Sequence, residues 1–173
     1  MLEPKPAEFE ALLERRRALG QDLYDEVWEG DYHMAPAPHS SHGYVGGQLA
    51  VLLHPLAQQA GLIDTDPFNL GSPDNYRVPD RGLLRAVPTT TYVPTAALVV
   101  EVVSPGDETW QKLGFYAAHS VDELLIADPA KRAVTWLVLH GGRYVEAEYS
   151  PLLRVDVAKL TEQINWPAVP TVD

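Results

Sequence analysis

The sequence predicts an α/β domain in which helices flank a mixed central sheet. Three observations support this prediction. Helical and strand-like segments alternate along the chain, the stretch 97–103 is nearly all apolar as in a central strand, and no repeat or low-complexity segment interrupts the pattern. A chain of 173 residues buries about 70% of the surface that its unfolded form exposes. We therefore expect one folded core rather than a disordered chain.

The first third of the chain predicts a helix followed by a strand pair. The helix is expected over 7–19 and ends at Gly20. The strand pair is expected over 23–34, with its turn at 29–31. The prolines that follow, within 34–38, require an extended loop because proline blocks both helix and sheet hydrogen bonds.

A long helix is expected next, over 40–60. Ser40 and Ser41 are suited to cap its first turn, and Gly61 is suited to end it. Pro55 lies inside this segment and should bend or interrupt the helix. The predicted apolar stripe consists of Val45, Leu49, Leu52 and Leu56.

The rest of the chain predicts strands around one further helix. That helix is expected over 107–118, after Pro105 and Gly106 end the apolar strand. Two short strands are expected within 67–86, and the segment after Pro151 fits neither type of element. The other expected strands lie at 96–103, 121–128, 132–139 and 143–149.

Composition and charge exclude several classes of protein. The chain has no cysteine, which excludes disulfides, thiolate metal sites and a cysteine nucleophile. With 24 Asp and Glu against 13 Lys and Arg, the net charge of −11 argues against strong non-specific binding to nucleic acid. No basic leader and no apolar run of about 20 residues is present, so we expect a cytoplasmic protein that spans no membrane.

Glu101 is the first candidate site residue because it interrupts the apolar strand. An ionised carboxylate in a buried strand is costly unless a metal ion or a paired cation compensates its charge. It also lies near the carboxyl end of the strand, where α/β sheets often place ligands. The alternative is a strand with one solvent-facing glutamate. Alternation places Glu101 on one face with Val99 and Val103, opposite Leu98, Val100 and Val102.

Asp80 is the second candidate carboxylate. It follows Pro79, directly after the expected strand 75–78. Asp74 also follows a proline, but Ser-Pro-Asp-Asn is typical of a turn. Asp80 is therefore the better candidate for a site, and an ordinary loop aspartate is the alternative.

Lys112 is the third candidate. The other lysines of the chain lie near its ends or beyond the central strand, whereas Lys112 lies on the helix that follows Glu101. The alternative is a solvent-facing lysine, because Lys112 falls opposite the expected apolar stripe of that helix. This stripe consists of Trp110, Leu113 and Ala117.

Three histidines, His33, His39 and His42, lie close together in the sequence and raise the question of a transition-metal site. No repeated ligand spacing supports such a site. His42 precedes Val45 by three residues and so extends the apolar stripe of the long helix. It is either a capping or core histidine, or a residue that faces a bound metal or phosphate.

Three arginines surround the second carboxylate. They offer a local phosphate contact in an otherwise acidic protein, or they pair with neighbouring carboxylates. They are Arg77, Arg81 and Arg85.

The motifs around these residues resemble the Uma2 family of restriction endonucleases, within the PD-(D/E)XK nuclease superfamily. The similarity lies in Glu-Val-Val-Ser-Pro at 101–105, Lys-Leu-Gly-Phe-Tyr at 112–116 and Val-Asp-Glu-Leu-Leu-Ile-Ala-Asp-Pro at 121–129. Upstream, Glu-Val-Trp-Glu-Gly at 26–30, Met-Ala-Pro-Ala-Pro at 34–38 and His42 agree with it. The resemblance covers about residues 22–150, and the order and spacing of the motifs carry it.

The resemblance implies a restriction-endonuclease-like sheet flanked by helices and a role for each candidate. Asp80 corresponds to the Asp of the PD element and Glu101 to the acidic residue of the (D/E)XK element, and both would hold Mg²⁺ or Mn²⁺. The lysine of that element belongs two residues after Glu101, where this chain has Val103, so Lys112 would replace it. His42 is included among the catalytic candidates.

The resemblance also implies an organisation and partners. We expect an N-terminal helical extension over 1–20, a nuclease-like domain over 21–160 and a tail over 161–173. DNA is the expected partner, bound weakly or site-specifically because of the acidic charge, and a homodimer is the expected assembly.

Two classes of function remain open on the sequence. The first is a Mg²⁺-dependent endonuclease that hydrolyses DNA phosphodiester bonds, favoured by the presence of Asp80, Glu101 and Lys112 together. The second is a catalytically inactive, nuclease-like interaction or regulatory module, favoured by the acidic charge and by Val103 at the usual lysine position.

Overall fold

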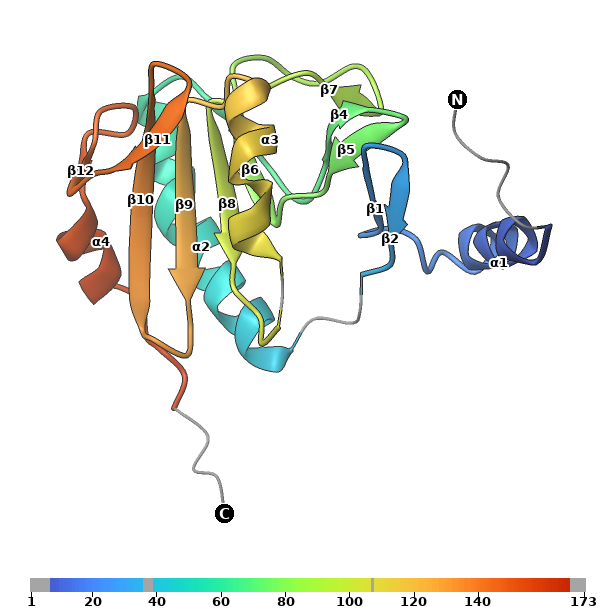
Figure 1. Ribbon diagram of the computed structural model, residues 1–173. Helices are drawn as coiled ribbons and strands as arrows, with labels where there is room; N and C mark the ends of the chain where they lie inside the picture. The colour runs from blue at the N-terminus through green and yellow to red at the C-terminus, as the bar shows by residue number, and fades with distance from the viewer. Residues whose placement is uncertain (1–6, 36–38, 107, 169–173) are drawn as a thin grey trace.

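The computed structural model describes residues 7–35, 39–106 and 108–168. Within these residues the larger sheet has six strands in the order β11-β10-β9-β8-β6-β3 (Figure 1). The β8–β9 pair is parallel and the other pairs are antiparallel. These strands are β3 (Ile63–Thr65), β6 (Arg81–Leu84), β8 (Leu98–Val102), β9 (Glu123–Asp128), β10 (Ala133–His140) and β11 (Arg143–Glu146).

The apolar strand β8 lies inside this sheet, paired with β6 on one side and β9 on the other. Its five residues are all buried, as expected of a strand covered on both faces. The predicted fold class, a mixed sheet flanked by helices, is confirmed.

A second sheet lies beside the first. Within the described residues it has the strand order β2-β1-β5-β4-β7. The β1–β2 hairpin turns at Glu29 and Gly30, whose φ angles of 48° and 97° are those of a tight two-residue turn. Its strands are β1 (Glu26–Trp28), β2 (Asp31–His33), β4 (Asn69–Ser72), β5 (Asn75–Arg77) and β7 (Tyr92–Val93).

Helices cover both faces of the larger sheet. One core lies between the sheet and α2 (Ser40–Gln59) and α4 (Val157–Glu162), and it includes Leu98, Val100 and Val102 of β8. The other core lies under α3 (Leu113–Ala118), which lies in front of the sheet in Figure 1, and it includes Val99. The predicted division of the β8 side chains between two faces is therefore confirmed, and Glu101 lies on the α3 side.

The long helix α2 departs from its prediction in three details. Its N-cap is His39, whose Nδ1 accepts from the Ser41 N–H, rather than a serine. It continues through Pro55 without interruption, because only one backbone hydrogen bond is lost in a 20-residue helix packed against the sheet. Its buried stripe is Val45, Leu49, Leu53 and Ala57, while Leu52 and Leu56 lie at the margin of the core.

The helix expected over 107–118 is two elements. Thr109–Lys112 form a 3-10 turn, η1, and α3 begins at Leu113. A 3-10 turn has three residues per turn, so the α-helical spacing that placed Lys112 opposite an apolar stripe does not apply. Trp110 of that expected stripe is 45% exposed, and the predicted stripe is wrong.

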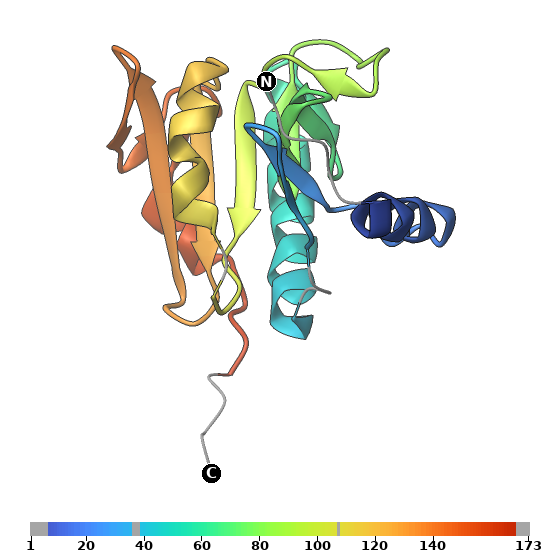
Figure 2. The same cartoon turned by 45° about the vertical axis from the view of Figure 1, so that its right-hand side comes forward.

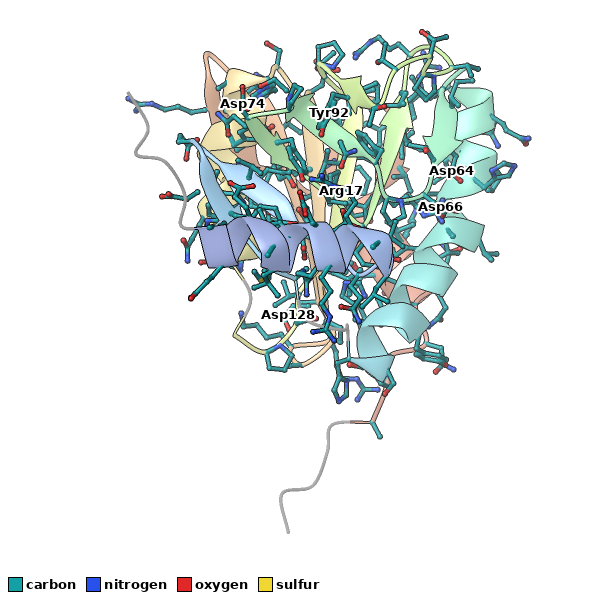
Figure 3. The ribbon with its side chains drawn as sticks, turned by 90° about the vertical axis from the view of Figure 1, so that its right-hand side faces the viewer. Arg17, Asp64, Asp66, Asp74, Tyr92 and Asp128 are labelled. Atoms are coloured by element: carbon teal, nitrogen blue, oxygen red, sulfur yellow. The ribbon has the colours of Figure 1, made fainter. Side chains whose placement is uncertain are left out.

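Two other segments contain more structure than expected. The region 67–86 holds three strands, β4, β5 and β6, of which β4 and β5 form the expected hairpin with Asp74 at its turn (Figure 3). The segment after Pro151 forms β13 (Val155–Asp156), paired with β12 (Tyr149–Ser150), and then α4.

The N-terminal helix α1 (Ala7–Ala18) lies beyond the β1–β2 hairpin, on the side away from the larger sheet (Figure 2). Arg16 connects it to the body through Asp25, which is buried and 2.7 Å from Arg16 Nη2. None of the helices in the described parts of the chain is long and apolar enough to cross a membrane.

Candidate active site

Asp80 and Glu101 lie next to each other because of the pairing between β6 and β8. Arg81 is paired with Val100 in this antiparallel ladder. The preceding residue, Asp80, is therefore opposite Glu101 when the register is continued by one residue. Opposite residues of an antiparallel pair lie on the same face. The Val102 N–H donates to Asp80 Oδ2 at 2.7 Å, which holds the Asp80 carboxylate against the end of β8.

Glu101 receives two donors from the elements that cover its face. Lys112 Nζ lies 3.3 Å from Glu101 Oε1. The Tyr116 hydroxyl on α3 donates to the same oxygen. Burial raises the pKa of Tyr116 well above its usual value, so the hydroxyl keeps its proton and remains a donor. Lys112 is thus a partly buried ion-pair partner, with its side chain 13% exposed, rather than a solvent-facing lysine.

A third carboxylate, Glu26 on β1, completes the cluster from the second sheet. Its Oε1 lies 2.9 Å from Lys112 Nζ and accepts from the Val78 N–H at 2.8 Å. Its Oε2 accepts from Trp28 Nε1 at 2.7 Å. Lys112 is therefore held by one carboxylate from each sheet, Glu26 on β1 and Glu101 on β8.

His42, in the first turn of α2, reaches the site through Asp80. Its Nε2 lies 3.0 Å from Asp80 Oδ2, on the same oxygen that accepts from Val102. When the ring carries a hydrogen on Nε2, it donates to the carboxylate and orients it. His42 therefore lies in the first turn of α2, and it also contacts a candidate metal ligand directly.

These side chains lie in a cleft of about 810 Å³ between the two sheets and the first turns of α2. The cleft is also lined by rings of the β1–β2 region and by glycines of α2. Its lining includes Tyr24, Glu26, Trp28, His33, Met34, His39, His42, Gly43, Gly46, Gly47, Asp80, Arg81, Glu101, Glu108 and Lys112.

The charges in the cluster do not balance. Three carboxylates, Glu26, Asp80 and Glu101, surround the single ammonium of Lys112. Burial lowers the pKa of Lys112, but the charges of Glu101 and Glu26 outweigh it, and the pKa is raised. Burial, together with the charge of Asp80, raises the pKa of Glu101 to about 7, despite the opposing effect of Lys112. The cluster therefore has more negative than positive charge, and the raised pKa of Glu101 is the consequence.

The raised pKa of Glu101 predicts a pH-dependent stability in the absence of divalent metal. Between its ordinary pKa of 4.5 and its folded value of about 7, the folded protein binds a proton that the unfolded chain releases. The free energy of unfolding should therefore fall as the pH rises through this window, by about 3 kcal/mol from Glu101 alone. Glu101→Gln should remove this loss, because the amide stays neutral.

Urea unfolding of the wild type and Glu101→Gln at about pH 5 and about pH 8, with chelator present, measures the difference. The exposed Glu146 gives a matched control: Glu146→Gln should follow the wild type at both pH values. Equal pH dependence of the wild type and Glu101→Gln would show that Glu101 is ionised throughout and that its pKa is not raised.

The chain is similar to a known protein family and to a solved structure. The chain matches the Uma2 family, described as "Putative restriction endonuclease", over residues 6–167. It belongs to this family. The fold is similar to a crystal structure from Anabaena variabilis ATCC 29413, described as "a putative nuclease belonging to DUF820", with a TM-score of 0.63 and 13% identity. That match covers 80% of this chain and 90% of the other. A comparison with curated proteins finds no match.

A divalent cation is the cofactor that the family resemblance implies. The oxygen donors of this site suit a hard cation. Asp80 Oδ1 and Glu101 Oε2 accept no hydrogen bond from the described residues, while the other oxygen of each carboxylate is engaged. Within 7–35, 39–106 and 108–168, no group of three or more His, Asp or Glu side chains is arranged to hold a metal ion. Two carboxylates with waters completing the shell are a typical Mg²⁺ environment.

The three histidines do not converge on a common site. His33 Nδ1 lies 3.1 Å from Glu108, His39 caps α2, and His42 contacts Asp80. A transition-metal site formed by all three is therefore contradicted for the described part of the chain.

The three arginines are engaged within the protein rather than presented to a ligand. Arg77 is buried and donates to the Val27 carbonyl at 2.9 Å. Arg81 pairs with Asp64 and Asp66, which lie beside α2 in Figure 3, and Arg85 pairs with Asp122. The alternative of pairing with neighbouring carboxylates is thus the one observed.

Sequence reasoning assigned no role to Glu26 or Tyr116, although each left a signal. Tyr116 ends the Lys-Leu-Gly-Phe-Tyr motif at 112–116, one of the motifs that carry the family resemblance. Glu26 is a carboxylate in a short strand and lies within one of the family motifs. Its contact with Lys112 joins residues 86 positions apart and depends on how the two sheets pack.

Proposed function

We propose that this Uma2 protein is a Mg²⁺- or Mn²⁺-dependent endonuclease that hydrolyses DNA phosphodiester bonds. The observation that carries the proposal is the arrangement at the end of β8. Asp80 and Glu101 lie adjacent with one oxygen of each available, and the partly buried Lys112 lies against Glu101 in the same cleft.

Asp80 and Glu101 are proposed to hold the cation, and its charge would offset the excess negative charge of the three-carboxylate cluster. When bound, such a cation supplies activation of a water molecule and stabilisation of charge on the phosphate. His42 and the Val102 N–H keep Asp80 in place. Lys112 occupies the role of the lysine expected at Val103, and its ammonium would stabilise charge on the transferring phosphoryl oxygens.

Cleavage of supercoiled plasmid and labelled oligonucleotides, with and without Mg²⁺ or Mn²⁺, tests the proposal. We expect strand cutting that requires the metal, is lost in Glu101→Ala and persists in the control Glu146→Ala. Cutting that survives in Glu101→Ala would assign it to another site or to a contaminant.

The alternative is a catalytically inactive, nuclease-like interaction module. It is favoured by the net charge of −11 and by Val103 at the usual lysine position. If the wild type cuts no DNA with either metal, this alternative becomes the better description. The homodimer stays a prediction, and sedimentation at tens of micromolar, an order-of-magnitude choice of concentration, measures it.

A further inference from the structure

The charges around the cleft do not suit an intact DNA duplex. Binding of duplex DNA depends largely on Lys and Arg side chains that neutralise successive phosphates. Among the described residues that line this cleft, carboxylates outnumber cationic side chains by four to two. The carboxylates are Glu26, Asp80, Glu101 and Glu108, and the cations are Arg81 and Lys112.

Both of these cations already have acidic partners. Lys112 lies between Glu26 and Glu101. Arg81 Nη1 is 2.7 Å from Asp64, and Nη2 is 2.6 Å from Asp66. A duplex laid over the cleft would therefore meet few uncommitted positive charges in the described part of the chain, and its binding must draw on another interaction.

That interaction is available from aromatic rings on the β1–β2 side of the cleft. The His33 ring stacks on Trp28, with ring centres 4.3 Å apart and planes 18° from parallel. The Arg77 guanidinium lies 4.2 Å from the centre of the Trp28 ring and 4.1 Å from that of Phe115. This column of stacked groups fixes the orientation of His33, so stacking a base against it costs little conformational entropy.

Further ring surface is exposed beside this column. Tyr24 also lines the cleft, and its side chain is about half exposed (49%). Stacking on aromatic side chains binds unpaired bases of any sequence, because every base has a π-face. A paired base within a duplex has both faces covered by its neighbours and cannot use these rings.

The cleft also has room for a strand on the α2 side. Gly43, Gly46 and Gly47 line it, and a Cβ added at any of them would meet no other residue within 4 Å. The backbone of α2 is therefore accessible there. At the floor, the Glu101 side chain is only 5% exposed, so a reacting phosphate must enter deeply. A flexible single strand enters such a site more easily than a stiff duplex.

We infer that the cleft takes an unpaired DNA strand rather than an intact duplex, with a base stacked on the ring surface of His33 or Tyr24. This inference rests on the proposed nuclease function and specifies the form of its substrate. The acidic charge of the protein then acts as a selectivity device, because it disfavours duplex binding while stacking and the metal-dependent contact retain the single strand.

Fluorescence anisotropy with a labelled oligonucleotide tests the inference, using the strand alone and the same strand annealed to its complement. The Lys112→Ala protein in Mg²⁺ is used, because it keeps both proposed metal ligands while cleavage of the probe is slow. We expect the single strand to bind at least about tenfold more tightly than the duplex through stacking. The affinity should depend only weakly on salt, because few cations of the cleft are free to neutralise phosphates.

Ring variants in the same background test the stacking surface. His33→Ala and Tyr24→Ala, each made separately, should show a loss of about tenfold in single-strand affinity for the ring that stacks the base. Tyr149→Ala removes an equally exposed ring (50%) outside the cleft and should change nothing. Circular dichroism of each variant confirms that a loss of binding is not a loss of fold.

The outcomes separate this inference from the proposed function. Duplex binding as tight as single-strand binding, no binding of either form, or full affinity in both ring variants would overturn the inference. Single-strand binding by Lys112→Ala together with a wild type that never cuts would support the strand-binding cleft and contradict the proposed catalysis.

Discussion

Lys112→Ala should lower the rate of metal-dependent DNA cleavage by about 10²–10³-fold while the protein remains folded and still binds Mn²⁺. The reason is the placement of the ammonium, which is partly buried and 3.3 Å from the candidate metal ligand Glu101. From there it would stabilise charge that develops on the phosphoryl oxygens, and alanine offers no replacement. Single-turnover cleavage rates at saturating metal measure the effect.

Two further lysine variants make this result specific. Lys112→Arg should restore the rate only in part, because the guanidinium is larger and differently shaped. Lys131, whose side chain is 72% exposed beside Asp128, provides the control, and Lys131→Ala should cut like the wild type. If Lys112→Ala cuts as fast as Lys131→Ala, Lys112 does not replace the lysine missing at Val103.

The double variant Asp80→Ala/Glu101→Ala should abolish detectable binding of Mn²⁺ in calorimetry. These two carboxylates supply the free oxygens of the candidate site, Asp80 Oδ1 and Glu101 Oε2, and a hard cation prefers such ligands. The wild type should bind Mn²⁺ weakly in the absence of DNA, because water molecules complete the coordination shell. The wild-type titration also fixes the number of ions bound per chain.

A second acidic pair separates specific ligation from general attraction to an acidic protein. Glu146 and Glu148 are exposed and lie outside the cleft, and Glu146→Ala/Glu148→Ala removes the same formal charge. This control should retain the binding of the wild type. Undiminished binding in Asp80→Ala/Glu101→Ala would place the metal elsewhere and remove the basis of the proposed mechanism.

The central strand and its carboxylate were predictable because they depend on local patterns. A strand in which consecutive residues, rather than every second residue, are apolar is buried on both faces, and β8 is such a strand. A carboxylate inside that run requires compensation wherever the chain folds. Glu101 could therefore be selected before its partners were known, and Asp80 followed from its place after the neighbouring strand.

The helical details were less predictable because tertiary packing overrides local preference. The proline at position 55 costs α2 one hydrogen bond, and the packing of the helix on the sheet outweighs that loss. The turn that holds Lys112 is 3-10 rather than α-helical, which changes the direction of every side chain in it. A helical wheel therefore placed Lys112 on the wrong side.

By itself, the sequence determined the α/β class, the buried strand, the two carboxylates and the single central lysine as candidates, since each follows from residue type and short-range spacing. Only the tertiary structure decided that Lys112 lies between Glu101 and Glu26, and that the arginines near Asp80 are engaged with other partners. These contacts join different elements of the fold, and ion pairs between separate segments depend on packing that no local pattern records.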